Sequence, residues 1–172
     1  MEGVQVSARL RFIAPALFAL AAAACGDGEG GALEGSVTPL LDLRYQRAEA
    51  RLAEGSLAVS FVETQGTGQD VVLKVSARVA DMLPEDPEYA GSLDIDLAEP
   101  LEDGSQRGSV DRSVLDEPVR PFPLLARGNL FVKSLPKTPG DRVSGEFNVT
   151  FVNGTDVYSG RTIFGRFEAT AP

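Results

Sequence analysis

Apolar and polar residues alternate through much of this chain, from residue 56 almost to its last residue. The alternating runs are centred on residues 57–61, 71–79, 93–97, 124–135, 147–151 and 163–169. A period of two places one face of a strand against a core and the other face in water. Gly, Pro, Asn and Asp separate the runs, so the pattern predicts an all-β fold. We expect an antiparallel β-sandwich or flattened barrel of about eight or nine strands.

Residues 39–54 fit two patterns. Apolar residues between 41 and 52 recur at helical spacing, and Thr38-Pro39 would suit the start of a helix. The same residues also alternate in two runs, 41–45 and 48–52, which are out of phase by one position. A bulge near Gln46-Arg47 would join these runs into one strand. We favour the strand, because a hairpin to the next run then needs only Glu54-Gly55.

The turn signals between the other runs differ in strength. Asn153-Gly154 between alternating apolar residues is the strongest one, and it predicts a hairpin with a three-residue loop that pairs Val149 with Val157. Residues 82–91 predict a loop with at most one helical turn. Residues 99–123 contain few apolar side chains and predict a long loop with a short strand near 109–114.

Composition excludes several kinds of chemistry. The 172 residues include 25 acidic and 16 basic side chains, and the net charge of −9 argues against nucleic acid as a partner. The chain has no histidine, which removes Ser-His-Asp and Cys-His catalysis and histidine-ligated zinc. One cysteine, Cys25, cannot form a disulfide within the chain. The sequence contains no recognisable catalytic centre, and we expect a protein that is not an enzyme.

The first 24 residues have the organisation of an export signal. Arg9 and Arg11 precede an uncharged stretch of about 13 apolar residues, whereas crossing a membrane takes about 20. Small residues then lead to Cys25. A basic start, a short apolar run and small residues at its end are the marks of a cleaved signal peptide.

The stretch Leu20-Ala21-Ala22-Ala23-Ala24-Cys25 resembles the lipobox of bacterial lipoproteins. The resemblance covers residues 1–25 and implies cleavage between Ala24 and Cys25, with acyl chains such as palmitate carried by Cys25. It also implies a lipid anchor in the cell envelope, and Gly26 in place of Asp favours the outer membrane over the inner one. Simple secretion with a free thiol at Cys25 is the alternative.

These features divide the chain into three parts. Residues 1–24 are the expected signal peptide, residues 25–35 the lipidated cysteine and a flexible glycine-rich tether, and residues 36–172 a single β-domain. The tether has no side chains that can pack against a core, so we expect it to stay flexible and to hold the domain clear of the lipid headgroups.

Acidic residues supply the only candidates for a metal site. Calcium binds six to eight oxygens, often from acids on a loop, and five acids lie within ten residues. The calcium candidates are Asp94, Asp96, Glu99, Glu102 and Asp103. A second acidic loop contains Asp81, Glu85, Asp86 and Glu88. The usual alternative is that such loops are simply hydrated, and we expect no cofactor other than this candidate calcium.

Ser134-Leu135-Pro136-Lys137 matches the Ser-x-x-Lys motif of penicillin-binding enzymes. That motif needs a helix to bring the lysine to the serine, and Pro136 lies between them at the expected end of a strand. We interpret the match as chance.

Three functions follow as hypotheses. The first is a lipid-anchored, non-catalytic envelope domain that binds or assists an envelope protein partner. The second is a carboxylate-based, calcium-dependent hydrolase, and the third is a purely structural envelope lipoprotein.

Overall fold

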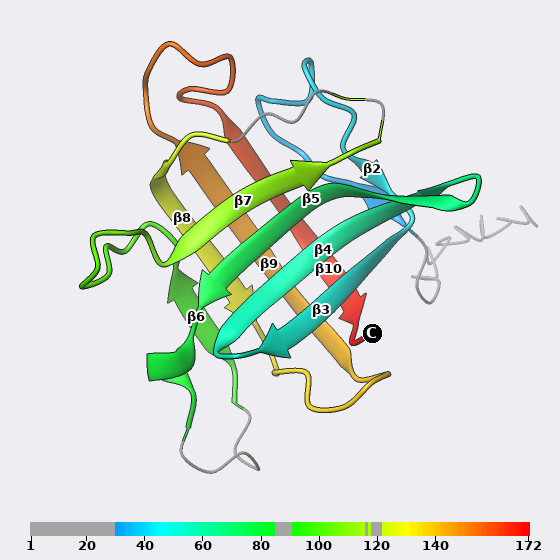
Figure 1. Ribbon diagram of the computed structural model, residues 1–172, viewed down its shortest axis with the longest axis vertical. Helices are drawn as coiled ribbons and strands as arrows, with labels where there is room; N and C mark the ends of the chain where they lie inside the picture. The colour runs from blue at the N-terminus through cyan, green and yellow to red at the C-terminus, as the bar shows by residue number, and fades with distance from the viewer. Residues whose placement is uncertain (1–29, 85–90, 116, 118–121) are drawn as a thin grey trace, which may run out of the picture.

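The computed structural model describes residues 30–84, 91–115, 117 and 122–172 (Figure 1). Within them the regular elements are strands apart from one 3-10 turn, η1 (Ala80–Met82), which confirms the all-β class. Two strands are short: β1 (Gly31–Ala32) and β2 (Arg44–Tyr45). The eight longer ones are β3 (Arg47–Ala53), β4 (Ser56–Gln65), β5 (Gly68–Arg78), β6 (Leu93–Asp96), β7 (Gly108–Ser113), β8 (Leu125–Val132), β9 (Arg142–Phe151) and β10 (Thr162–Thr170).

The eight longer strands form one sheet in the order β6-β8-β9-β10-β3-β4-β5-β7. The sheet folds over, so that β3, β4, β5 and β7 make one layer and the other four strands make the second (Figure 1). The two outermost strands then meet. The Gly108 amide donates to the Leu97 carbonyl at 2.8 Å, and the Leu97 amide donates to the Gly128 carbonyl at 2.9 Å. The result is a flattened barrel, one of the two predicted forms.

Apolar side chains from both layers fill the interior. Phe61 of β4 has no exposed surface, and its ring centroid lies 5.5 Å from that of Phe147 and 6.1 Å from that of Phe167 in the other layer. Burial of one such side chain contributes roughly 1.5–3 kcal/mol to stability. Other large, fully buried side chains are Leu57, Leu73, Ile95, Leu97, Leu130, Phe151 and Ile163. The interior is therefore a packed core.

The ambiguous segment is a strand from Arg44 onward, as favoured, whereas residues 39–43 belong to a loop. β3 pairs with β4 from Arg47–Val62 to Ala53–Ser56, and Glu54-Gly55 forms the two-residue turn. Both turn residues have positive φ, 51° and 73°, as a type I′ hairpin turn requires. The expected irregularity falls at Gln46, which separates β2 from β3.

The alternation of residues 71–79 predicts that Val71 shares the core face with Leu73, Val75, Ala77 and Val79, and this is wrong for Val71. Val71 is half-buried, whereas Val72 and Leu73 are both buried. The register explains this, because Phe61 pairs with Leu73 and Val62 pairs with Val71, which leaves Val72 as an extra residue in a bulge. A bulge lets two consecutive side chains reach the core, which simple alternation cannot predict.

The register predicted for the hairpin at Asn153-Gly154 is wrong. Val149 pairs with Ile163 instead of Val157, and residues 152–161 form one long loop between β9 and β10. Tyr158 accounts for the length: it is buried, and its ring lies 4.8 Å from that of Phe122. Packing of this ring outweighs the local preference for a tight turn.

Two further expectations need correction. The sheet is not wholly antiparallel, because β10 and β3 pair in parallel at Ala169–Ala48 and Thr170–Glu49.

Residues 99–123 are also less irregular than expected. β7 lies near the predicted position, and residues 97–108 form a hydrogen-bonded hairpin in which the Arg107 amide donates to the Glu99 carbonyl at 2.8 Å.

The end of the predicted tether belongs to the folded domain. β1 pairs with β2, and Glu34 exchanges backbone hydrogen bonds of 3.0 and 2.9 Å with Phe164 of β10. Leu33 is only 2% exposed. Residues 31–35 therefore fill the barrel wall between β2 and β10, above the short parallel pair, and the assignment of 25–35 to a flexible tether is wrong for these residues.

This placement predicts that Leu33 matters to stability. Leu33→Ala should lower the free energy of unfolding by about 2–5 kcal/mol, because it leaves a cavity in the core. The neighbouring exposed residue offers a control, and Ala32→Ser should change the value by less than about 0.5 kcal/mol. Urea unfolding of both variants checks this, and equal effects would show that residues 31–35 do not belong to the wall.

Candidate functional site

The five calcium candidates do not converge on a common point. Asp94 on β6 accepts a hydrogen bond from the Asn129 side chain on β8. The carboxylate of Asp96 accepts one from the Ala98 amide at 2.9 Å. Both acids are thus engaged by neighbouring groups on the outside of the barrel.

The other three candidates lie on the β6–β7 hairpin. Glu99 pairs with Arg107 at 2.6 Å, and Asp103 pairs with Arg78 at 2.9 Å and accepts a hydrogen bond from the Ser105 amide. These hydrogen bonds, with Ser105 the strongest contributor, hold the pKa of Asp103 well below its usual range. Glu102 is exposed at the tip of the hairpin. In the described ranges no group of three or more His, Cys, Asp or Glu residues could hold a metal ion, so the structure gives the calcium site no support.

The second acidic loop is described only in part. Asp81, in η1, pairs with Arg107 at 2.7 Å. Glu85, Asp86 and Glu88 lie outside the described residues. The chance reading of the Ser-x-x-Lys match agrees with the local structure, because Ser134 and Lys137 lie in the turn between β8 and β9 and not on a helix.

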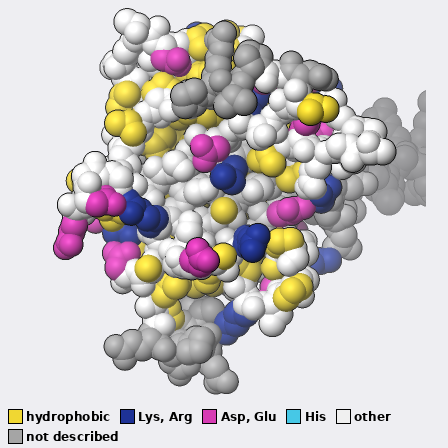
Figure 2. Space-filling view, in the orientation of Figure 1, with side chains coloured by type: hydrophobic (Ala, Val, Ile, Leu, Met, Phe, Trp, Pro, Cys, Tyr) yellow, Lys and Arg dark blue, Asp and Glu magenta, His cyan; other side chains and the backbone are white. Residues whose placement is uncertain are grey.

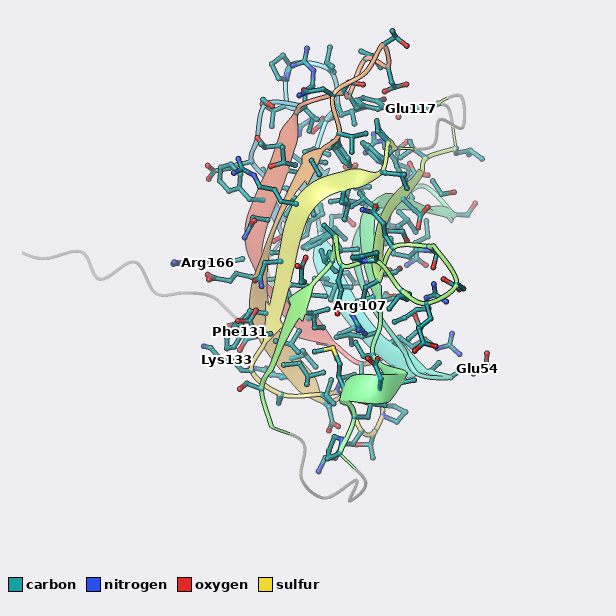
Figure 3. All side chains as sticks on the ribbon, turned by 90° about the vertical axis from the view of Figure 1, so that its left-hand side faces the viewer. Glu54, Arg107, Glu117, Phe131, Lys133 and Arg166 are labelled. Carbon is teal, nitrogen blue, oxygen red and sulfur yellow. The ribbon has the colours of Figure 1, made fainter. Side chains whose placement is uncertain are left out.

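Arg107 is the centre of the charged side chains at this end of the barrel (Figure 3). It is 6% exposed, and its guanidinium donates to Asp81 at 2.7 and 2.9 Å, to Glu99 at 2.6 Å and to the Arg78 carbonyl at 2.8 Å. Hydrogen bonding to Arg107 lowers the pKa of Asp81, and the two carboxylates raise the pKa of Arg107. The cluster ties η1, β5 and the β6–β7 hairpin together, and its groups are already satisfied.

Arg112 on β7 makes a similar connection at the opposite end. Its guanidinium donates to the Val72 carbonyl at 2.7 Å and to the Asp42 carbonyl at 3.1 Å, and it pairs with Glu117 at 2.7 Å. These contacts attach the loop of residues 36–43 to the end of the barrel.

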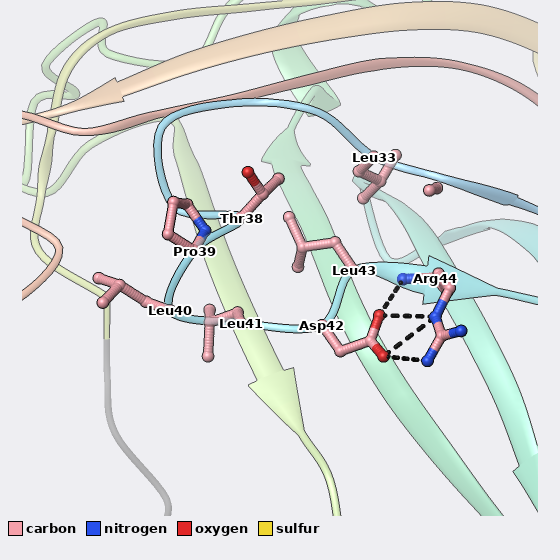
Figure 4. Close-up of a pocket in the computed structure, with 9 residues that line it drawn as sticks. Leu33, Thr38, Pro39, Leu40, Leu41, Asp42, Leu43 and Arg44 are labelled. Carbon is pink, nitrogen blue, oxygen red and sulfur yellow. Dashed lines mark hydrogen bonds and ion pairs between the residues drawn. The ribbon is translucent and has the colours of Figure 1, made fainter.

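A surface hollow of about 400 Å³ lies at that loop (Figure 4). Asp42 and Arg44 line it and pair at 2.5 Å, and the hydrogen bonds from Arg44 lower the pKa of Asp42 to about 2. At pH 7 the Asp42 carboxylate is therefore ionised, and the positive charge of Arg44 balances it. A carboxylate with so low a pKa is unsuited to act as a general base. The hollow offers no other titratable side chain for catalysis.

Exposed aliphatic side chains surround the same end of the barrel. Leu115 is 82% exposed and Leu124 66%, and Leu40 and Val157 are each about two-fifths exposed. We call these four residues the apolar rim. Figure 2 shows hydrophobic side chains grouped at the upper end of the molecule, where Figure 1 draws the loops that carry them.

Backbone contacts hold these loops at one end. The Val152 amide donates to the Leu124 carbonyl at 2.9 Å, which joins two of the loops. Beneath the rim, Phe122 stacks on Phe151 at 5.0 Å and contacts Tyr158, so the rim rests on the aromatic end of the core. Sequence reasoning missed the rim. The sequence signal that could have indicated the rim is the presence of single leucines in polar, proline-rich segments.

Comparison of the chain with protein-family models, with curated proteins and with solved structures returned no match. The lipobox residues, including Ala24 and Cys25, lie outside the described residues. Over the described ranges, no helix is both long enough and apolar enough to cross a membrane.

The Arg107 cluster yields a prediction about stability. Arg107→Ala should lower the free energy of unfolding by about 1–3 kcal/mol, because it removes the hydrogen bonds of a buried group. Arg78→Ala is a matched control at an exposed ion pair and should lower it by about 0.2–1 kcal/mol.

The effect of Arg107→Ala should also depend on pH. Because Arg107 lowers the pKa of Asp81 in the folded state, this pairing stabilises the fold above about pH 4 and loses its effect as the pH falls below that value. Urea unfolding at pH 7 and pH 3 measures both trends. An equal loss for the two arginine variants would contradict a special role for Arg107.

Proposed function

We propose that this protein is a lipid-anchored, non-catalytic module of the bacterial cell envelope that binds a protein partner through its apolar rim. The anchor is the acylated Cys25, and Gly26 favours the outer membrane. One observation carries the binding role: the exposed aliphatic side chains at one end of a barrel whose interior is already filled.

The sequence and the start of the domain support the anchor. The apolar run of residues 12–24 precedes Cys25, and the wall of the barrel begins at Gly31, six positions later. Cleavage before Cys25 would remove the apolar run and leave every described residue in place. The domain and the expected processing site are therefore compatible.

The distribution of side chains supports binding over catalysis. The chain lacks histidine, and on the β6–β7 hairpin Glu99 pairs with Arg107, while Asp103 pairs with Arg78 and accepts hydrogen bonds from Ser105. The apolar rim, in contrast, exposes surface that would lose contact with water in a complex. Exposed apolar side chains that gather at one end of a protein often mark an interaction site.

Loss of the sulfur should abolish the anchor. Wild-type protein expressed in a Gram-negative bacterium should incorporate radiolabelled fatty acid and sediment with membranes, and Cys25→Ser should lose both properties, since no other thiol is present. Ala24→Gly keeps a small residue directly before the cleavage site and should retain label as a control. Equal label and equal membrane association in Cys25→Ser would refute the lipoprotein assignment.

Polar substitutions in the rim should abolish partner binding. A photo-crosslinking residue at Val157 should yield one discrete crosslinked protein in the native host, and Leu115→Ser with Leu124→Ser should reduce that product at least several-fold. Both leucines are exposed, so the stability of the variant should change by less than about 1 kcal/mol.

The same photo-crosslinker at Ser109, an exposed position on β7, provides the control. It should not yield this product. A product of equal yield from both positions, or one that the leucine substitutions do not reduce, would exclude the rim as the binding surface.

A further inference from the structure

We propose that the outer face of β9 and β10 around Phe164 lies against the phospholipid bilayer that holds the anchor, so that the barrel rests on its side. This inference relies on the proposed acylation of Cys25 and adds the orientation of the domain. Its partner is a glycerophospholipid surface, and it leaves the apolar rim free for a protein.

The point where the chain joins the barrel suggests this orientation. β1 enters the wall beside Tyr45, below the Glu34–Phe164 bridge and above the parallel Ala48–Ala169 pair. A Cβ added at Gly30 would lie 1.9 Å from the Tyr45 carbonyl oxygen, so Gly30 is pressed against β2. The chain therefore meets the barrel at its side, far from either end.

The length of chain before this point limits how far the domain can stand from the bilayer. Five Cα–Cα steps lead from Cys25 to Gly30, which allows at most about 17–18 Å when fully extended. A compact domain of this size has a radius of gyration of about 15 Å and a diameter of roughly 35–40 Å. The tether is thus shorter than the domain is wide, and the side that carries Gly30 has to remain near the membrane.

The surface beside this point is suited to the headgroup region. A hollow of about 560 Å³ is lined by residues of β9 and β10 and of the segment 32–34, among them Phe164, Arg166 and the acids Glu34 and Glu146. Phe164 is 43% exposed, and aromatic side chains gain free energy at the boundary between headgroups and acyl chains. Figure 3 shows Arg166, Phe131 and Lys133 on this outer face, with Glu54 on the far side of the molecule.

Charge alone does not decide between the two layers. Arg127, Lys133, Arg142 and Arg166 on this layer are offset by the acids Glu34, Asp94, Asp96, Glu146 and Glu168, and Arg166 pairs with Glu146 at 3.1 Å. The outer face of the other layer also carries arginines, among them Arg47 and Arg51. The position and length of the tether therefore carry the inference, and Phe164 adds the contact.

Fluorescence quenching in vesicles tests the orientation. Acylation blocks the thiol of Cys25, so a second cysteine gives one labelling site on the full-length, lipidated protein. Arg166→Cys lies on the proposed bilayer face, Ser109→Cys lies on β7 in the opposite layer, and Val157→Cys lies on the rim; all three positions are exposed. Each labelled protein is reconstituted in phosphatidylethanolamine–phosphatidylglycerol vesicles that contain spin-labelled headgroups.

Quenching at residue 166 should exceed quenching at residues 109 and 157 several-fold. Equal quenching at the three positions, or the strongest quenching at residue 157, would overturn the inference. Fatty-acid labelling of the same samples separates the two proposals. Samples without acyl label refute the anchor, whereas acylated samples with equal quenching refute only the orientation.

A longer tether provides a further control. Insertion of ten Gly and Ser residues after Gly28 should remove most of the difference between residues 166 and 109, since the domain could then turn freely. A difference that persists in full would overturn the claim that tether length imposes the orientation.

Discussion

Closure of the sheet at two seams is the constraint on which the rest of this structure depends. At one seam the β6–β7 hairpin bonds to β8, where the Gln106 side chain also donates to the Leu125 carbonyl at 2.7 Å and accepts from its amide at 2.8 Å. At the other seam, residues 31–35 fill the space between β2 and β10. Unpaired strand edges favour aggregation, and a closed sheet avoids them without a disulfide.

The second seam connects the fold to the anchor. The residues that complete the wall directly follow the segment proposed to carry the lipid, so an acylated Cys25 would place the domain almost at the membrane. A flexible linker of ten residues would have separated the two. Under the proposed acylation of Cys25, the shorter linker makes the geometry of the barrel wall bear on how the protein faces the bilayer.

The strand pattern was predictable because it is a local property. Alternation located β4, β5, β8 and β10, and Glu54-Gly55 located the β3–β4 turn, since that turn type requires two residues that tolerate positive φ. The β9–β10 register was not predictable. Burial of Tyr158 against Phe122 lengthens that loop, and nothing close to Asn153-Gly154 indicates this contact.

The candidate site was predictable only as a set of acids close in sequence. Glu99 and Asp103 share a hairpin, but each has an arginine partner; Arg78, the partner of Asp103, is 25 residues away. Such contacts across elements turn an apparent cluster of ligands into separate ion pairs. The apolar rim, in contrast, consists of residues from three loops. Each of its leucines is an ordinary residue in its own segment, so the sequence does not indicate that they lie at the same end of the barrel.

The sequence by itself determined which residues face the core along most strands, the absence of histidine chemistry and the proposal of a lipid anchor, because each depends on residue type or on spacing within a few positions. Only the tertiary structure decided which strands meet and which acids are paired. It also decided where the chain enters the barrel. These features depend on contacts between distant segments, such as the hydrogen bond between Ser36 and Thr162 across 126 residues, and no local pattern encodes them.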